Sequence, residues 1–364
     1  MVTTSSMLQD STQQYCLEHG VSIATSTYYR VSMLISFLTS SASAIYMSYF
    51  LYRYHNRSPF FHTNLKTLFF ALSFTYLAYD LINIGMKAHH LALSYLFKAP
   101  CQIFLPRLLY IFFIVSTTSV YLISQLMLIT IVIERWAAFI LFRSYESSYR
   151  NLGRGLILAV VHLNAFILLV IFYGQNFDEL QLNGRMFPTA VYIRVNVLFI
   201  TLLGLNFTGF VFTIALQLLR PKRRIQMPLS SKFQSNENSI ASTLLFWITT
   251  FQFALYGTSQ AVVIFIRIYA SQNPMAIAYK ENSDFFNFLT LAMPILSTYY
   301  SRKVKRQRID RIRSQIEFFN FLTLAMPILS TYYSRKVKRQ RIDRIRSQIE
   351  LVVYTHAFVL IDEI

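Results

Sequence analysis

Long apolar stretches recur along the chain and are separated by shorter polar segments. Seven of these stretches approach or exceed the roughly 20 residues that an α-helix needs to cross a hydrocarbon core about 30 Å thick. The stretches are 31–52, 65–86, 108–133, 155–174, 195–219, 240–266 and 285–300. The pattern predicts an all-α membrane protein, a seven-transmembrane helix bundle over 31–300 that follows an N-terminal segment over 1–30.

The composition excludes most classes of soluble protein. Only 14% of the residues are charged, whereas about 25% is usual for a soluble domain. The 33 Phe and 24 Tyr residues are also too many to stay solvated in a disordered chain. Although the formal net charge is +18, the chain lacks the polar surface of a nucleic-acid-binding domain. We therefore expect membrane lipids and no nucleic acid as partners.

One segment of the chain occurs twice without a single change. Residues 285–317 are repeated at 318–350, and residues 351–364 form the C-terminal end. Identity over a whole repeat is typical of a very recent or spurious duplication, because structural repeats diverge in their separate environments. We interpret 318–350 as a duplicated exon or an assembly error. The alternative is a genuine tail segment that lies in the membrane interface as an amphipathic helix.

The basic residues are unevenly distributed over the connecting segments. With the N-terminus outside, 19 of the 27 Lys and Arg residues that precede the second repeat copy lie on the cytoplasmic side. Since cytoplasmic loops carry an excess of Lys and Arg, the sequence predicts the N-terminus outside and the C-terminus inside. Segment 301–317 then forms a basic cytoplasmic tail, either as an amphipathic helix with Ile309, Ile312 and Ile316 on one face or as a solvated segment.

Four polar or reactive side chains lie on or near the predicted helices. Asp80 is the one acid well inside an apolar stretch, and an intramembrane carboxylate is a functional candidate because its burial is costly. It either pairs with Arg107 or is a structural or interfacial acid. Cys16 and Cys101 both fall on the oxidising side in the predicted orientation, so they either form a disulfide or remain two free thiols.

An acidic and a basic residue adjoin where the third stretch meets the cytoplasm. Glu134 and Arg135 are followed by Trp136, at a place where an ion pair can be closed in one packing of a bundle and released in another. The alternative is an ordinary helix end, with interfacial charges and a tryptophan at the lipid headgroups. Position alone leaves both interpretations open.

Motifs in two predicted cytoplasmic loops resemble those of a receptor superfamily. The first loop contains Glu-Arg-x-x-Ala at 134–138 and the pair Tyr145-Glu146, and the second contains Leu-Ser-x-Lys-Phe-Gln-x-x-Glu-Asn at 229–238. At these places in a seven-helix layout, the motifs together resemble the nematode seven-transmembrane chemoreceptors of the Sra superfamily, which includes the Sra, Srab, Srb and Sre families. Within the superfamily we favour Sre or Srab.

The resemblance implies a chemosensory G-protein-coupled receptor in the plasma membrane, in the cilium of a sensory neuron. Its expected partners are an unknown small-molecule ligand and a heterotrimeric G protein. The residues expected to act in coupling or switching are Glu134, Arg135, Tyr145, Glu146, Lys232, Gln234, Glu237 and Asn238. Glu134 and Arg135 would stand where rhodopsin-like receptors carry Asp-Arg-Tyr, although the NPxxY motif of those receptors is missing from 285–300.

The sequence favours a receptor over an enzyme or a transporter. It has no Gly-rich phosphate loop, no HExxH or GxSxG motif and no paired carboxylates at membrane depth. Two cysteines are too few for a multi-thiolate metal site, and we expect neither a metal nor a cofactor. A polytopic transporter or channel without G-protein coupling is the alternative, although the tandem repeat differs from the inverted repeats of many transporters.

Overall fold

The structure of the chain, a computed structural model, consists of helices and their connections in the part that it describes. The described residues are 13–56, 63–141, 145, 149, 151–219, 229–269, 279–280 and 285–300, with helical pieces between 302 and 347. The chain divides into two compact units, Met1–Ser301 and Arg302–Ile364. Each unit is described by itself.

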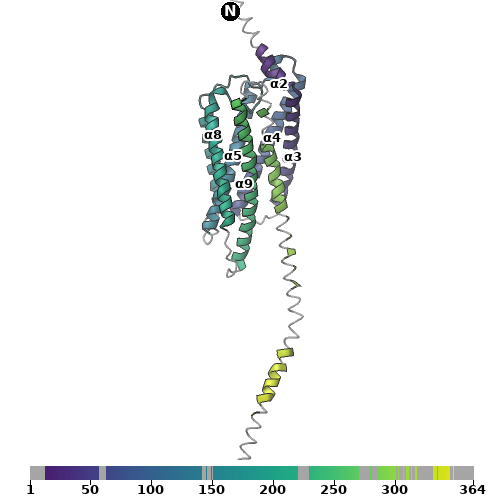
Figure 1. Cartoon of the computed structure of the whole chain (residues 1–364), viewed down its shortest axis with the longest axis vertical. Helices are drawn as coiled ribbons and strands as arrows, with labels where there is room; N and C mark the ends of the chain where they lie inside the picture. Colours follow the sequence, from purple (N-terminus) through teal and green to yellow (C-terminus); the bar gives the residue numbers. More distant parts are fainter. Residues whose placement is uncertain are drawn as a thin grey trace, which may run out of the picture. The chain divides into compact units, whose positions relative to one another are not determined.

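The first unit contains a bundle of long helices (Figure 1). They are α3 (Thr27–Asn56), α4 (Thr63–Leu96), α5 (Arg107–Ile140), α7 (Leu152–Phe172), α8 (Tyr192–Leu218) and α9 (Leu229–Tyr269). Each has a window long and apolar enough to cross a membrane, and a further helix covers 286–300. The shorter elements are η1 (Leu17–Val21), α2 (Ser22–Ala24), η2 (Pro100–Ile103) and η3 (Thr189–Val191). The predicted all-α, seven-helix layout is confirmed, and its orientation in the membrane stays a prediction.

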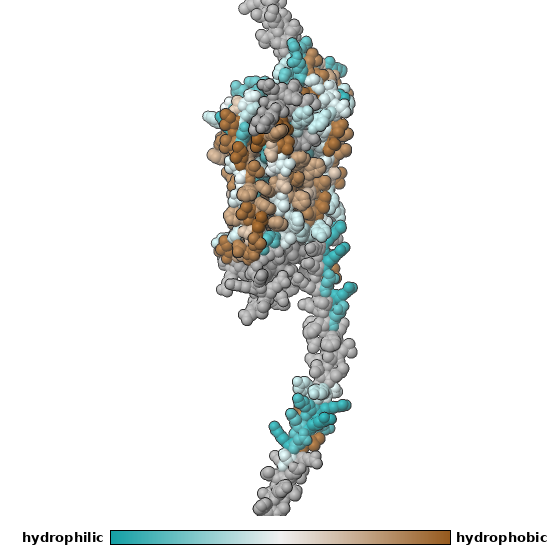
Figure 2. All heavy atoms as spheres, in the orientation of Figure 1, coloured by the Kyte–Doolittle hydropathy of each residue, from teal (hydrophilic) through white to brown (hydrophobic). Residues whose placement is uncertain are grey.

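Helix α5 occupies the centre of the bundle, because it packs against α4, α7, α8 and α9. It contributes Leu122, Met127 and Ile131, which are almost completely buried, to the main apolar core. By contrast, α7 has many exposed apolar side chains, and apolar residues cover much of the side of the bundle in Figure 2. An apolar surface around a helical bundle suits a hydrocarbon surrounding, because the helices satisfy the hydrogen bonds of their own backbone and lipid contacts apolar side chains.

Helices α4 and α5 are among those that extend beyond the apolar stretches that predicted them. Helix α4 continues to Leu96 and α5 to Ile140, so that both have 34 residues. Proline residues bound the connection between them, since Pro100 opens η2 and Pro106 precedes α5. The additional turns of α4 carry Leu91, which packs against the N-terminal segment. Hydrophobicity alone therefore underestimated these helices, because their last turns are stabilised by protein contacts.

The N-terminal segment is held over one end of the bundle by a covalent bond. Cys16, just before η1, forms a disulfide with Cys101 in η2. Gly20 is required at this contact, because a Cβ atom there would lie 2.8 Å from side-chain atoms of both Ile103 and Phe104. We call this end of the bundle the disulfide end, and the end at which α5 finishes the opposite end.

The second unit is described only in short helical pieces. The longest covers 335–344, within the second copy of the repeat, and its residues are exposed. In the first copy Ile309 and Ile316 are helical and exposed, whereas Ile312 lies outside the described residues. The amphipathic tail helix stays a prediction, and so does the interpretation of 318–350 as a recent or spurious duplication.

We predict that removal of the disulfide destabilises the N-terminal segment. The bond joins residues separated by 85 positions, and a cross-link over so long a loop contributes about 2–4 kcal/mol by restricting the unfolded chain. The double variant Cys16→Ser, Cys101→Ser should melt roughly 5–10 °C below the wild-type protein in detergent. It should also be cut faster by protease near η1. Unchanged melting and cleavage under non-reducing conditions would contradict this role.

Candidate functional site

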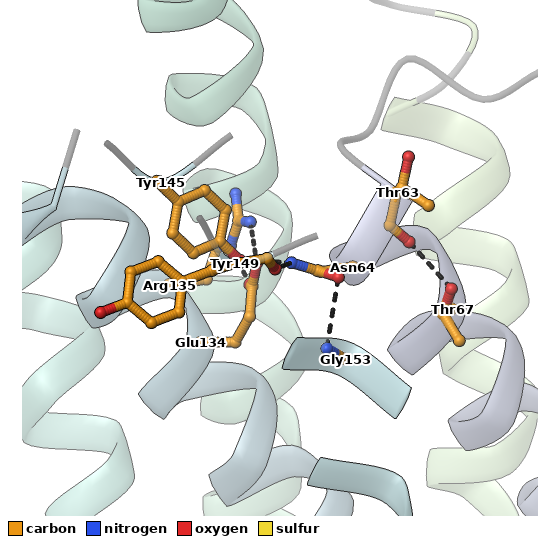
Figure 3. Close-up of polar contacts among 8 residues, drawn as sticks. All are labelled: Thr63, Asn64, Thr67, Glu134, Arg135, Tyr145, Tyr149 and Gly153. Atoms are coloured by element: carbon orange, nitrogen blue, oxygen red, sulfur yellow. Dashed lines mark hydrogen bonds and ion pairs between the residues drawn. The ribbon is translucent and has the colours of Figure 1, made fainter. Parts of the chain in front are cut away.

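A buried ion pair lies at the opposite end of the bundle, within the last two turns of α5. Glu134 is fully buried and Arg135 is 4% exposed. The guanidinium donates from Nε to Oε2 and from Nη2 to Oε1 of the carboxylate, both at 2.5 Å (Figure 3). Charges at so little exposure are tolerated when they are paired, because leaving either one buried alone costs several kcal/mol.

Tyr145, a helical residue between α5 and α7, contacts the same carboxylate. Its hydroxyl donates to Oε1 of Glu134 at 2.5 Å, and Nδ2 of Asn64, at the start of α4, donates to the Tyr145 oxygen at 3.1 Å. Burial and the adjacent Glu134 carboxylate raise the pKa of Tyr145. The phenol therefore keeps its proton and stays a donor to Glu134. We call Asn64, Glu134, Arg135 and Tyr145 the lock.

Asn64 also joins the beginnings of α4 and α7. Its Nδ2 donates to the carbonyl oxygen of Tyr149 at 2.7 Å, and its Oδ1 accepts from the backbone N–H of Gly153 at 3.2 Å (Figure 3). The second bond satisfies one of the backbone donors that the first turn of a helix leaves unpaired. The approach requires glycine, because a Cβ atom on Gly153 would lie 2.9 Å from the backbone oxygen of Asn64.

A second buried polar network lies deeper in the bundle, around Asp80 of α4. This residue is fully buried, and its two carboxylate oxygens accept hydrogen bonds from Ser43 of α3 at 2.6 Å and from Thr290 at 2.9 Å. Thr290 belongs to the 286–300 helix. Because lipid offers no replacement hydrogen bonds, the network favours one relative placement of these three helices.

Arg185 reaches the same region from the loop between α7 and α8. Its Nη2 donates to the Tyr79 hydroxyl at 2.6 Å and to Oδ1 of Asn83 at 2.8 Å. Asn83 in turn donates from Nδ2 to Ser40 of α3 at 2.6 Å and to Asn287 at 3.0 Å. The loop is thereby connected to the helices that hold the buried carboxylate.

The sequence of the bundle matches one family of receptors. Residues 25–257, more than half of the chain, match the family described as "Serpentine type 7TM GPCR chemoreceptor Srb". The chain belongs to the Srb family. It is therefore a multi-pass membrane receptor of the chemosensory class and not an enzyme. Membership of the Sra superfamily is confirmed, whereas the preference for Sre or Srab is not, because the matching family is Srb.

This Srb receptor is similar to several proteins of Caenorhabditis elegans. It is 26% identical to serpentine receptor class beta-17 over 277 residues, which cover 74% of this chain and 76% of that relative. It is 24% identical to serpentine receptor class beta-13, over 68% of this chain and 73% of that relative. A shorter match, 25% identical, joins 47% of the chain to 54% of serpentine receptor class alpha-10. The class beta matches thus extend over most of each relative.

The structure brings together part of the predicted coupling set of the Srb receptor. Glu134, Arg135 and Tyr145 meet in the lock, whereas Glu146 lies outside the described residues. The predicted residues of the second motif fall within the first turns of α9, where the backbone but not the side chains is described: Lys232, Gln234, Glu237 and Asn238. A role of α9 in coupling stays a prediction.

Of the alternatives that the sequence leaves open for Asp80, the structure shows a buried structural acid and not a pairing with Arg107. Arg107, the first residue of α5, forms an exposed ion pair with Asp178 at 2.8 Å and donates to the carbonyl oxygen of Asn176 at 2.5 Å. Asp80 instead accepts hydrogen bonds from hydroxyl groups of two neighbouring helices. Counting along a stretch predicts the depth of a residue, but the direction of its side chain depends on the rotation of the helix within the bundle.

Sequence reasoning missed Asn64, Gly153 and Arg185 as members of these networks. Asn64 and Gly153 are 89 residues apart along the chain, so no local pattern announces their contact. A signal was present in the glycines, since the chain has only nine and two of them, Gly153 and Gly155, fall in the first turn of α7. Glycine at the start of a packed helix often marks a close approach of two backbones.

We predict that Gly153→Ala destabilises the Srb receptor and that Gly155→Ala does not. The first change forces a Cβ atom against the Asn64 backbone, whereas a Cβ atom at 155 meets no described atom within 4 Å. Alanine also favours the helix by about 0.5–1 kcal/mol relative to glycine. In detergent, Gly153→Ala should therefore lower the melting temperature by several degrees and Gly155→Ala should leave it equal or slightly higher. The reverse order would refute the close approach.

Proposed function

We propose that this Srb receptor converts the binding of a small external ligand into activation of a heterotrimeric G protein, with the lock as its switching element. The burial of Arg135 against Glu134 carries the proposal. A guanidinium that is 4% exposed has to leave its carboxylate before it can contact a partner. A pair that is closed in one packing and open in another is a two-state element that a ligand can bias.

Helix α4 provides a physical connection between the lock and the rest of the bundle. It carries Asn64 in the lock and Asp80 in the deeper network, 16 residues and therefore about 24 Å apart along a helix. A ligand that changes how α4 packs against α3 would also move Asn64. Displacement of Asn64 weakens the support of Tyr145, and with it the closed ion pair.

We propose an orientation with the N-terminus outside and the lock in the cytoplasm. The distribution of Lys and Arg supports it, since 19 of the 27 that precede the second repeat copy then face the cytoplasm. The disulfide supports it as well, because Cys16 and Cys101 then face an oxidising compartment. Membership of a chemoreceptor family favours the plasma membrane, in the cilium of a sensory neuron, as the location.

The start of α9 is the second part of the proposed G-protein surface. The indole N–H of Trp136 donates to the carbonyl oxygen of Phe212 at 3.3 Å, so that the end of α8 lies beside the lock end of α5. Because α8 finishes there at Leu218 and α9 begins at Leu229, the α9 motif belongs to the same end. Its proposed contact residues are Lys232, Gln234, Glu237 and Asn238. Glu146, from the first loop motif, is a further proposed contact residue.

We predict that Tyr145→Phe raises ligand-independent signalling. The change removes the hydroxyl that donates to Glu134 and so weakens the closed state by about 1 kcal/mol or more, which is roughly a fivefold shift toward the open state. G-protein activation is measured in transfected cells at matched surface expression. Tyr149→Phe is the control, because Tyr149 stacks on Tyr145 but contributes only its backbone carbonyl to the lock. Equal basal signals from the two variants would argue against the lock.

We predict that adding Arg135→Ala to Tyr145→Phe abolishes the raised signal. An open lock acts through the released guanidinium. A receptor without it, delivered to the cell surface in the same amount as Tyr145→Phe, should therefore give no more signal than untransfected cells. Arg154→Ala in the same background is the control, because Arg154 is an exposed cation of the same end of the bundle. An undiminished signal in the Arg135 variant would remove this residue from the mechanism. An epitope at the N-terminus, detected on intact cells, reports both delivery and orientation.

A further inference from the structure

Three carboxamide side chains meet in the middle of the bundle. Gln252 of α9 donates from Nε2 to Oε1 of Gln125 at 2.5 Å and to Oδ1 of Asn206 at 2.7 Å. Asn206 of α8 donates from Nδ2 to the same Gln125 oxygen at 2.9 Å. These side chains come from three helices, and their residues are at most 7% exposed. We call Gln125, Asn206 and Gln252 the amide triad.

The amide triad leaves one donor and one acceptor open. Among the described residues, neither Nε2 of Gln125 nor Oε1 of Gln252 has a hydrogen-bond partner, and both atoms are buried. Each open group costs about 1–3 kcal/mol, and the lipid around the helices offers no replacement. The two open atoms belong to carboxamides that a 2.5 Å bond joins, and a group that accepts from Gln125 and donates to Gln252 would satisfy both.

Aromatic rings lie about one helical turn from the triad, toward the disulfide end. Tyr121 precedes Gln125 by four residues on α5, and Tyr256 follows Gln252 by four residues on α9, which runs in the opposite direction. The ring centroids of Tyr121 and Tyr256 are 5.9 Å apart, and that of Phe286 lies 4.9 Å from Tyr121. Rings from three helices thus meet about one helical turn from the triad.

The ring of Tyr121 keeps accessible surface although α5 is the central helix. Tyr121 is partly exposed, whereas Phe112, nine residues earlier, is 57% exposed on the outer surface of the bundle. Nine residues correspond to about 900° of helical rotation, so the two side chains lie on opposite faces of α5. The accessible part of Tyr121 therefore faces the interior of the bundle, beside Tyr256 and Phe286.

We propose that the amide triad and the rings of Tyr121 and Tyr256 bind a small neutral molecule with an apolar body and one group that both donates and accepts a hydrogen bond. A hydroxyl or a primary amide has this property. The hydrogen-bond partners of the triad in the described part of the chain are uncharged, so a charged ligand would lose its hydration there without gaining a counter-charge. The inference rests on the proposed receptor function and names its ligand class.

Binding of three matched probes to the purified full-length receptor tests the inference. Benzyl alcohol donates and accepts a hydrogen bond, anisole only accepts one, and toluene does neither. Titration of each probe against the melting temperature yields an affinity. We expect saturable binding, with an affinity for benzyl alcohol about tenfold or more above that for toluene. The affinity for anisole should lie between the two, because each buried hydrogen bond contributes about fivefold to tenfold. Equal affinities of the three probes would overturn the proposal.

Variants assign the preference to the triad. Gln125→Met and Gln252→Met each remove an open polar atom at nearly constant side-chain length, and both should bind benzyl alcohol no better than toluene. Gln217→Met is the control, since Gln217 is another glutamine of the bundle that donates to the Ser242 carbonyl oxygen at 2.7 Å. It should keep the wild-type preference. A preference that survives in both triad variants would place the binding elsewhere.

Two features keep this test decisive and separate from the test of coupling. If a triad variant does not fold, the comparison of the three probes on the wild-type receptor still tests the proposal. Binding is measured without a G protein, so an unchanged basal signal in Tyr145→Phe leaves the result standing. Conversely, failure of the probes to discriminate leaves the role of the lock untouched.

Discussion

The hydrogen bonds that Ser43 and Thr290 donate to the Asp80 carboxylate hold three helices of the bundle in one arrangement. A carboxylate at this depth has no water to return to, so the two hydroxyl groups and the helices that carry them have to stay where they are. Helix α4, which carries Asp80, also supplies Asn64 to the lock. The position of this one helix therefore affects both the network around Asp80 and the closure of the lock.

The two sites proposed for the Srb receptor share helix α5. Gln125 of the amide triad and Glu134 of the lock are nine residues apart, which is about 14 Å along the helix. A helix packed on four neighbours shifts or rotates as a unit, because its interior is too dense to absorb the change locally. Occupation of the triad can therefore reach the ion pair without a chain of intermediate contacts, by a small displacement of α5 against α4, the helix that supplies Asn64.

The fold was predictable because hydrocarbon imposes a simple requirement on a spanning segment. Length and apolar content identified seven helices, and adjacent Glu134 and Arg135 were visible as a pair in the sequence. The partners of that pair were less accessible. Tyr145 entered only through a family motif, and Asn64 not at all, since its contact with Gly153 joins residues 89 positions apart. The sequence could not decide whether Asp80 pairs with Arg107, because periodicity within one helix does not determine how that helix is rotated against its neighbours.

The amino-acid sequence by itself determined that this chain is a helical membrane receptor, since hydropathy, composition and loop motifs are properties of consecutive residues. Only the tertiary structure decided which polar groups meet: Asp80 with Ser43 and Thr290, Tyr145 with Glu134, and the three carboxamides of the triad. Each of these contacts depends on the rotation and height of two or more helices. Those quantities follow from the packing of the whole bundle, which no single stretch of sequence encodes.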